Sequence, residues 1–283
     1  MHPIYADPTD RAQLWALLEA TWPGLPARFD LADWHGWPID AVSTPFVTRV
    51  DDRIVSHVGV LDLAVRLGGQ DRRIAGLHGA CTMPDVRRQG HFGAAMERAM
   101  VYIRERFSTA KLSTDKPWAY EPFGFRSVPQ HRARVALSGA GGPGCRPVIE
   151  ADLPWMNRLL EDRAPMSDRF AALDHAWLLG IDGVLWSGGL GIFQAIEALD
   201  VVVAWEIEGR SLQVYQVVAR DLPSLEQLLL HCPWSFDEVV LWFGADLLAP
   251  GAEPVAFPQD EHLMVWGDWP EQGPFCVPPL EAH

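Results

Sequence analysis

The sequence predicts an α/β protein of two domains, each with a mixed, mainly antiparallel sheet flanked by helices. Its 283 residues are about twice the usual domain length, so two domains of roughly 140 residues each are expected. In both halves, segments of helical period alternate with short apolar runs joined by turn residues, in the order helix, meander, helix, strand. Hydrophobic residues make up 48% and charged residues 21%, which is the balance of a globular protein.

The chain opens with a predicted helix over Arg11–Trp22, whose leucines recur at helical spacing behind Asp10, the expected N-cap. Turn residues at Asp51-Asp52 and at Gly68-Gly69-Gln70 then indicate an antiparallel meander. The three strands expected in it are Phe46–Val50, Ile54–Leu67 and Ile74–Met83.

From Gly90 the apolar period changes from that of a strand to that of a helix, so GHFGAAMERAMVYIRER predicts an amphipathic helix. The apolar segment Ala110–Ser113 and the alternating run Arg132–Leu137 are expected to complete this first unit. The glycine-rich residues 138–144 follow and indicate a linker. The sequence therefore predicts domains of residues 1–142 and 143–283.

The second half repeats the order of the first without obvious sequence identity to it. A helix is expected over Ala151–Arg163, a hairpin over Asp200–Ile207 and Ser211–Val218, a second helix over Leu222–His231, and a buried strand over Glu238–Phe243. Eight of the thirteen tryptophans lie in this half, most of them expected in the core.

The charge is distributed unevenly. The net charge is −14; residues 1–143 carry 17 basic and 15 acidic side chains, and residues 144–283 carry 6 and 22. The acidic half argues against nucleic acid and either attracts a cationic substrate or simply maintains solubility. No apolar stretch approaches the roughly 20 residues of a membrane span, and the amino terminus lacks a secretory pattern. The four scattered cysteines are expected to be reduced thiols, so a cytoplasmic protein without membrane contact is predicted.

The stretch most informative about chemistry is ACTMPDVRRQGHFGAAM, residues 80–96, which joins a strand end to a helix start. The first amides of a helix have no intrahelical partners and lie at its positive dipole end, so they favour an anion. Gly90 and Gly93 leave room for a pyrophosphate, and Arg87 and Arg88 add positive charge. The GxxxxGK[ST] and GxGxxG patterns are absent, which argues against nucleotide hydrolysis and hydride transfer.

Within this stretch, RRQGHFGAA resembles the coenzyme A pyrophosphate loop of GNAT superfamily N-acetyltransferases, with Phe92 in place of a usual small residue. YEPFGF, Tyr120–Phe125, resembles a second signature of that family, after the next strand. The whole chain is similar to the tandem GNAT-like domains of the enhanced-intracellular-survival aminoglycoside acetyltransferases. Those enzymes carry a third, sterol-carrier-like domain that 283 residues cannot accommodate.

The resemblance implies acetyl-CoA as co-substrate and no metal. It makes Tyr120 the acid that protonates the departing thiolate, and the amide of Thr82 the group that polarises the acetyl carbonyl. Cys81 has no evident base beside it in sequence, so a covalent acetyl-enzyme is not expected. The implied cofactor-binding residues are Cys81, Thr82, Met83, Arg87, Arg88, Gln89, Gly90, His91, Phe92, Gly93 and Ala94.

The base that deprotonates the acceptor is left open between His78, His57, a water chain, an unnamed carboxylate and the C-terminal carboxylate of His283, which the resemblance suggests. Trp118 is a candidate for the acceptor mouth. The second half has no Arg-Arg-x-Gly loop, with Asp221-Leu222-Pro223 standing in its place, so it is expected to complete the acceptor pocket without binding coenzyme A.

The predicted function is therefore transfer of acetyl from acetyl-CoA to a primary amine by direct attack. The expected acceptor is a small-molecule or peptide amine, and a cationic one would fit the acidic second half. Whether the protein forms a homo-oligomer is left open. Two alternatives are a coenzyme A-binding sensor or pseudoenzyme, and a protein interaction module that holds a basic partner on the acidic half.

Overall fold

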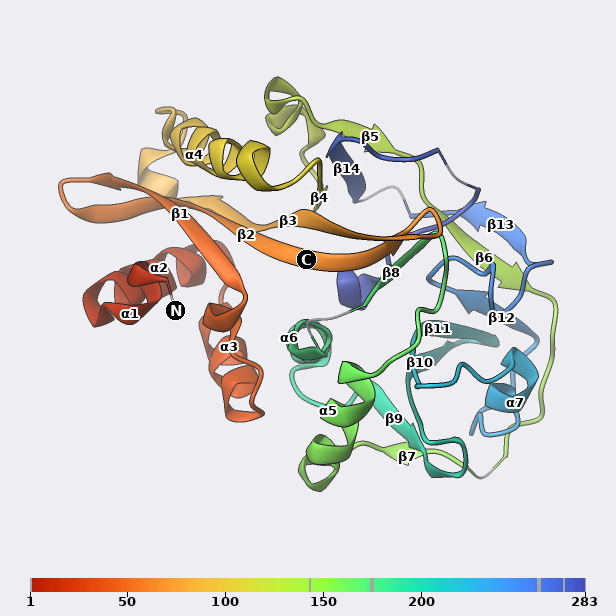
Figure 1. Cartoon of the computed structure of the whole chain (residues 1–283). Coiled ribbons are helices and arrows are strands. Elements are labelled where there is room, and N and C mark those ends of the chain that lie inside the picture. The colour runs from red at the N-terminus through yellow and green to blue at the C-terminus, as the bar shows by residue number, and fades with distance from the viewer. Residues whose placement is uncertain (1, 143, 174–175, 259–260, 272, 283) are drawn as a thin grey trace.

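The computed structural model describes residues 2–142, 144–173, 176–258, 261–271 and 273–282. The strands in these residues form two seven-stranded sheets, with helices between them and on their outer faces (Figure 1). Both sheets are mainly antiparallel, so the predicted α/β fold is confirmed. No helix in the described residues is long and apolar enough to cross a membrane.

The first sheet has the strand order β1-β2-β3-β4-β14-β5, with β8 paired to β2. Neighbouring strands are antiparallel except β3 and β4, which are parallel. The strands are β1 (Ser43–Val50), β2 (Arg53–Leu67), β3 (Gln70–Thr82), β4 (Thr109–Thr114), β5 (Arg126–Val128), β8 (Phe170–Ala172) and β14 (His262–Gly267).

The second sheet repeats this pattern, in the order β13-β6-β12-β11-β10-β9-β7. Its one parallel pair among the described strands is β11 with β12, which corresponds in position to β3 with β4. The strands are β6 (His131–Val135), β7 (Arg146–Pro147), β9 (Phe193–Ile196), β10 (Val201–Glu208), β11 (Ser211–Val218), β12 (Glu238–Leu241) and β13 (Glu253–Ala256).

The two sheets exchange a strand. β14, near the end of the chain, lies between β4 and β5 in the first sheet, whereas β6 lies between β12 and β13 in the second. The expectation that Arg132–Leu137 completes the first unit is therefore wrong. Its alternating pattern identifies a strand but does not specify the partner, and Ala133 pairs with Leu241 of the second sheet. Sheet membership thus does not follow a boundary at residue 142.

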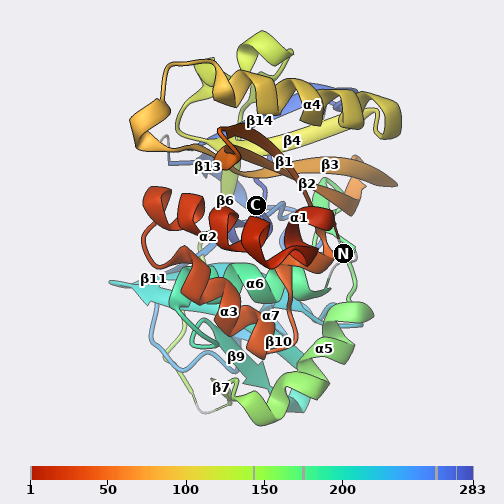
Figure 2. The ribbon, with the colours of Figure 1, turned by 90° about the vertical axis from the view of Figure 1, so that its left-hand side faces the viewer.

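Helices form an outer layer on the first sheet and a layer between the sheets, and α7 packs on the outer face of the second sheet (Figure 1). Figure 2 shows α4 on one side of the first sheet, and α2, α3 and α6 on its other side. The apolar face of α4 forms a core with β2, β3 and β14. The helices are α1 (Pro3–Ala6), α2 (Pro8–Thr21), α3 (Leu25–Trp34), α4 (His91–Arg106), α5 (Leu153–Glu161), α6 (Ala176–Ser187) and α7 (Leu225–Leu229).

Two predicted helix ends are corrected. The first predicted helix begins one turn earlier than expected, because the side chain of Asp7, and not that of Asp10, accepts hydrogen bonds from the amides of Thr9 and Asp10. The helix expected over Leu222–His231 is only α7, which Ser224 caps through the amide of Gln227.

A buried carboxylate joins the two sheets. The Glu281 side chain is 2% exposed; its Oε2 accepts from the amide of Ala172 on β8 at 2.9 Å, and its Oε1 from Gln216 Nε2 on β11 at 2.7 Å. The backbone carbonyl of Glu281 accepts from Lys111 Nζ on β4 at 2.8 Å. The Arg163 guanidinium lies 3.7 Å from the Glu281 carboxylate oxygen Oε1. A buried charge is stable only when it is paired and hydrogen-bonded, so these contacts fix the sheets relative to one another.

The strand exchange predicts that residues 1–142 do not fold alone. The fragment lacks β14, so β4 and β5 lose the strand that joins them, and Met264, 0% exposed, is missing from the α4 core. Thermal unfolding followed by circular dichroism is expected to show no cooperative transition for the fragment and one for the full chain. A cooperative transition of the fragment close to that of the full chain would contradict the exchanged arrangement.

Candidate functional site

The parallel strands β3 and β4 separate along their length. Their register contains only Ala75 with Ala110 and Gly76 with Lys111, although β3 continues to Thr82. On its other side β3 stays paired with β2 as far as Ser56 with Thr82. Residues 77–82 therefore have one edge without a strand partner among the described strands, and backbone groups at such an edge can bind an extended ligand.

β3 carries a bulge within this open part. His57 pairs with Cys81 and Gly59 with His78, so β3 has one residue more than β2 in the interval. Gly79 has φ +57°, and a Cβ there would lie 3.3 Å from the His57 ring. Glycine therefore provides both the left-handed conformation and the room for that ring.

The strand leads into a turn and then into the N-terminus of α4. Arg88 and the N-cap Gly90 have positive φ, 64° and 85°, and no side chain caps the helix. The first hydrogen bond of the helix runs from the Ala94 amide to the Gly90 carbonyl at 3.0 Å. The amides of residues 91–93 therefore have no acceptor within the helix. Arg87 Nε donates to the Thr82 carbonyl at 3.1 Å, which ties the exposed turn to the strand end. This geometry suits an anion.

The end of β3 offers one amide to the open edge. The Met83 amide donates to the Val55 carbonyl at 2.9 Å, so this implied cofactor residue has its N–H already bonded to β2. Because successive residues of a strand direct their amides to opposite sides, the Thr82 amide faces away from β2. Burial raises the pKa of the Cys81 thiol to about 12, so this thiol is neutral at physiological pH.

Tyr120 lies beside this edge, under α4. Its ring packs edge-on against Phe92, with centroids 5.5 Å apart, and against Phe125 at 6.2 Å. Burial raises its pKa to about 12, and the charges of Asp115 and Cys81 act in the same direction. The phenol is therefore protonated over the physiological range and is suited to donate a proton.

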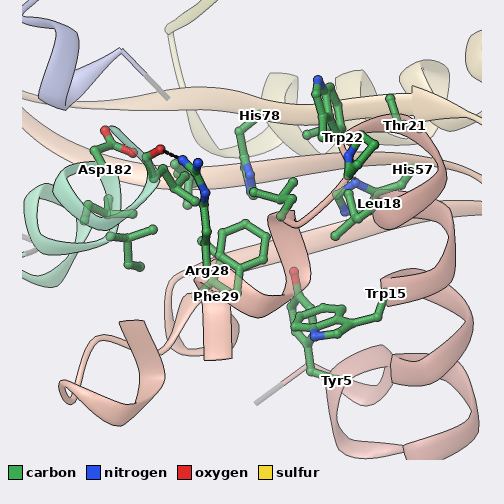
Figure 3. A pocket seen from close by; sticks show the side chains of 18 residues that line it. Tyr5, Trp15, Leu18, Thr21, Trp22, Arg28, Phe29, His57, His78 and Asp182 are labelled. Carbon is green, nitrogen blue, oxygen red and sulfur yellow. Dashed lines mark hydrogen bonds between the residues drawn. The ribbon is translucent and has the colours of Figure 1, made fainter. Parts of the chain in front are cut away.

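On the opposite face of the first sheet lies a cavity of about 570 Å³ between α2, α3 and α6 (Figure 3). Its lining is mainly apolar and contains four aromatic side chains, those of Tyr5, Trp15, Trp22 and Phe29. Leu178, Ile181 and Leu185 of α6 close one side, so the second half of the chain contributes to the cavity.

His57 and His78 form part of the sheet-side wall of the cavity, with ring centroids 6.2 Å apart. His78 Nε2 lies 2.8 Å from Ser43 Oγ, to which the Tyr5 hydroxyl donates at 3.0 Å. His57 Nδ1 lies 2.8 Å from the Gly79 carbonyl, which can only accept, so Nδ1 carries the proton. Burial lowers the His57 pKa to about 4.

Cys81, at the open strand edge, lies beside the cavity. Thr21 lines the cavity and hydrogen-bonds the Cys81 thiol. Cys81 is also close enough to Tyr120 for its charge to influence the Tyr120 pKa. Groups from both faces of the sheet therefore meet around Cys81.

The structure brings most of the sequence-predicted residues together along β3, the turn and the start of α4. Trp118, expected at the acceptor mouth, is 68% exposed and does not line the cavity. His283 lies outside the described residues. The aromatic cavity wall was not predicted, because helical period does not indicate that the aromatic residues of the first helices and the apolar residues of α6 line one cavity. No group of three or more metal-ligating side chains occurs among the described residues.

The parallel strands of this mixed sheet separate beside an uncapped helix, and together they offer a strand edge and a helix N-terminus to an extended anionic ligand. Residues 12–128 match the family model of the GNAT acetyltransferase domain. The chain therefore carries a GNAT acetyltransferase domain, which makes it an acyltransferase and confirms the predicted resemblance.

The chain is similar over almost its whole length to solved structures. A GCN5-related N-acetyltransferase from Kribbella flavida is 16% identical, with 91% of this chain and 68% of that chain covered and a TM-score of 0.56. Eis1 from Mycobacterium abscessus is 15% identical, with 92% and 71% covered and a TM-score of 0.59. A GCN5-related N-acetyltransferase from Anabaena variabilis is 14% identical, with 92% and 70% covered and a TM-score of 0.57. At these identities the likeness shows the fold. No curated protein matches the sequence.

The burial of the cysteines predicts their reactivity. Burial raises the pKa of all four thiols; Cys81, Cys232 and Cys276 are buried, and Cys145 is the one partly accessible thiol. A disulfide-exchange reagent at about pH 8 is therefore expected to titrate Cys145 quickly and the other three only after denaturation. The Cys145→Ser variant serves as the control, since it should remove the fast phase. Rapid labelling of Cys81 in the native protein would contradict the neutral, buried thiol.

Proposed function

We propose that this protein transfers the acetyl group of acetyl-CoA to a primary amine by direct attack. The observation that carries the proposal is the open edge of β3, which ends at the uncapped start of α4 within the GNAT acetyltransferase domain. A pantetheine arm has amides that can pair with a strand edge, and a pyrophosphate suits helix amides with nearby arginines.

In this arrangement the implied donor residues have two tasks. Thr82 presents its amide to the open edge where the pantetheine arm lies, and Cys81 and Met83, whose amides face β2, shape the end of the strand. The amides of His91, Phe92 and Gly93, between Gly90 and Ala94, receive the pyrophosphate, while Arg87, Arg88 and Gln89 border it. α7 does not offer an equivalent site, because Ser224 already occupies its first amides.

The chemistry assigns one role to a backbone amide and one to a phenol. The Thr82 amide donates to the acetyl carbonyl and stabilises its developing negative charge. The amine nitrogen forms a bond to the carbonyl carbon, the carbon–sulfur bond breaks, and the departing sulfur takes the proton of Tyr120. The nitrogen loses a proton to solvent, and Tyr120 takes up a proton from solvent. The products are an acetamide and free coenzyme A.

The apolar cavity on the other face of the sheet is the acceptor site in this proposal, and residues 143–283 complete it through α6. In this proposal residues 1–142 bind the donor and supply most of the acceptor wall, and residues 143–283 complete that wall. The four free cysteines fit a reducing compartment, so we propose a cytoplasmic location.

Isothermal titration with acetyl-CoA tests the donor site. The full chain is expected to bind one equivalent, and Arg88→Glu is expected to weaken binding by about tenfold or more, because a carboxylate replaces a cation beside phosphate. Arg104→Glu makes the same charge change at the other end of α4 and should bind as the wild type does. A wild type that does not bind acetyl-CoA would favour the interaction module.

Removal of the Tyr120 hydroxyl tests the chemical step. Tyr120→Phe is expected to lower kcat by about a hundredfold, the size of a general-acid contribution, and to leave acetyl-CoA affinity nearly unchanged. Tyr102→Phe removes a hydroxyl from the half-buried tyrosine on α4 and should retain full activity. Coenzyme A release over a panel of amines measures both. Tight binding without turnover for any amine would favour the sensor or pseudoenzyme.

A further inference from the structure

The polar groups of the acceptor cavity differ in whether they have hydrogen-bond partners. The Tyr5 hydroxyl and His78 both hydrogen-bond Ser43 Oγ, and the Arg28 guanidinium donates to the Leu185 carbonyl. His57 Nε2 is buried and has no hydrogen-bond partner among the described residues. The Gly79 carbonyl fixes the proton on Nδ1, so Nε2 carries the lone pair of a histidine that belongs to the cavity wall. A buried acceptor without a partner is costly unless a ligand supplies the donor.

The charge around the cavity does not suit a cation. Asp182 is the one carboxylate among the described residues that line it, and its charge acts on Lys111, whose pKa it tends to raise. Figure 3 shows Asp182 and His57 toward opposite ends of the cavity, with His78 between them. An ammonium group placed at His57 would therefore lose its hydration without a countercharge.

The remaining walls favour an apolar body. Trp15 and Phe29 pack against each other with ring centroids 5.9 Å apart, and Trp15 packs against Tyr5 at 6.2 Å. Leucine and isoleucine side chains of α6 face these rings across the cavity. Such a space of about 570 Å³ accommodates an aromatic or branched aliphatic group and gains stability by removing it from water.

We infer that the acceptor is an uncharged primary amine on an aromatic or branched aliphatic body, with its N–H donated to His57 Nε2. The inference rests on the proposed acetyl transfer and specifies its substrate class. It departs from the cationic acceptor that the acidic second half suggested. His57 touches the substrate nitrogen and orients its remaining lone pair toward the acetyl group.

The proton balance follows from this pose. As the nitrogen–carbon bond forms, nitrogen becomes cationic and far more acidic than the free amine, and its proton passes to His57 Nε2. The carbon–sulfur bond breaks and the sulfur takes the Tyr120 proton. Because burial disfavours a charged imidazole, His57 passes the proton to solvent and Tyr120 recovers one, which leaves an acetamide and free coenzyme A.

The first test compares amines of different chemistry on the wild-type protein. Coenzyme A release at saturating acetyl-CoA is measured with 2-phenylethylamine, spermidine and kanamycin. The value of kcat/KM for 2-phenylethylamine is expected to exceed the other two by about tenfold or more, because only its body is removed from water in the cavity. Preference for spermidine or kanamycin would overturn the inference and leave acetyl transfer intact.

The pH dependence supplies a second readout. The titratable or charged groups facing His57 and the cavity are His78 and Cys81 on β3, Tyr5 on α1, Arg28 on α3 and Asp182 on α6. Cys81 and Tyr5 have pKa values of about 12, well above the range tested. Between about pH 7.5 and 9.5, above the ordinary histidine range, kcat/KM should therefore rise about tenfold per unit as the amine itself loses its proton. A flat profile would contradict binding of the uncharged form.

Substitution of His57 tests the nitrogen contact. His57→Gln is expected to lower kcat/KM for 2-phenylethylamine by about tenfold or more with an unchanged KM for acetyl-CoA. His35→Gln replaces another buried histidine that does not line the cavity and should have no effect. Equal activity of His57→Gln and wild type would remove His57 from the proposal.

A binding measurement separates failure of the inference from failure of the proposed function. Trp15 and Trp22 line the cavity, so their fluorescence reports an occupant without turnover. Acetyl-CoA-loaded protein that turns over no amine should still show a saturable change with 2-phenylethylamine, and no change would overturn the inference. Protein that does not bind acetyl-CoA would instead overturn the proposed function.

Discussion

The position of the cavity between α2, α3 and α6 depends on the buried carboxylate of Glu281. Its hydrogen bonds reach β8 of the first sheet and β11 of the second, and the carbonyl of the same residue holds Lys111 of β4. Removing one partner of such a buried set leaves an uncompensated polar group, at a cost of about 3–5 kcal/mol. The last residues of the chain therefore fix the distance between the sheets, and with it the place of α6 on the cavity.

Periodicity predicts much of the fold but not the pairing of its strands. The meander β1 to β3 and the helix α4 follow from local patterns, because each buries one face and is bounded by turn residues. The exchange of β6 and β14 was not predictable in this way, since any strand of suitable pattern can pair with the edge of β4 or β12. α6 was missed for a different reason: AWLLGIDGVLWS is apolar around most of its circumference and has no clear helical period.

The same contrast applies to the candidate site. The turn before α4 and Tyr120 belong to contiguous motifs, so the sequence identified both. His57 remained one of several candidate bases, because its significance depends on the Gly79 carbonyl that sets its tautomer and on the bulge that admits its ring. The apolar walls come from α2, α3 and α6, which no local pattern relates to one another.

The exchange of strands also determines when the first sheet can be completed during protein synthesis. β14 pairs with β4 across roughly 150 residues of chain, so the first sheet stays incomplete until β14 has left the ribosome. A nascent chain therefore presents an unpaired β4 edge while the residues between these two strands are translated. A ribosome that stalls before β14 would release a polypeptide whose β4 and β5 lack the strand that joins them.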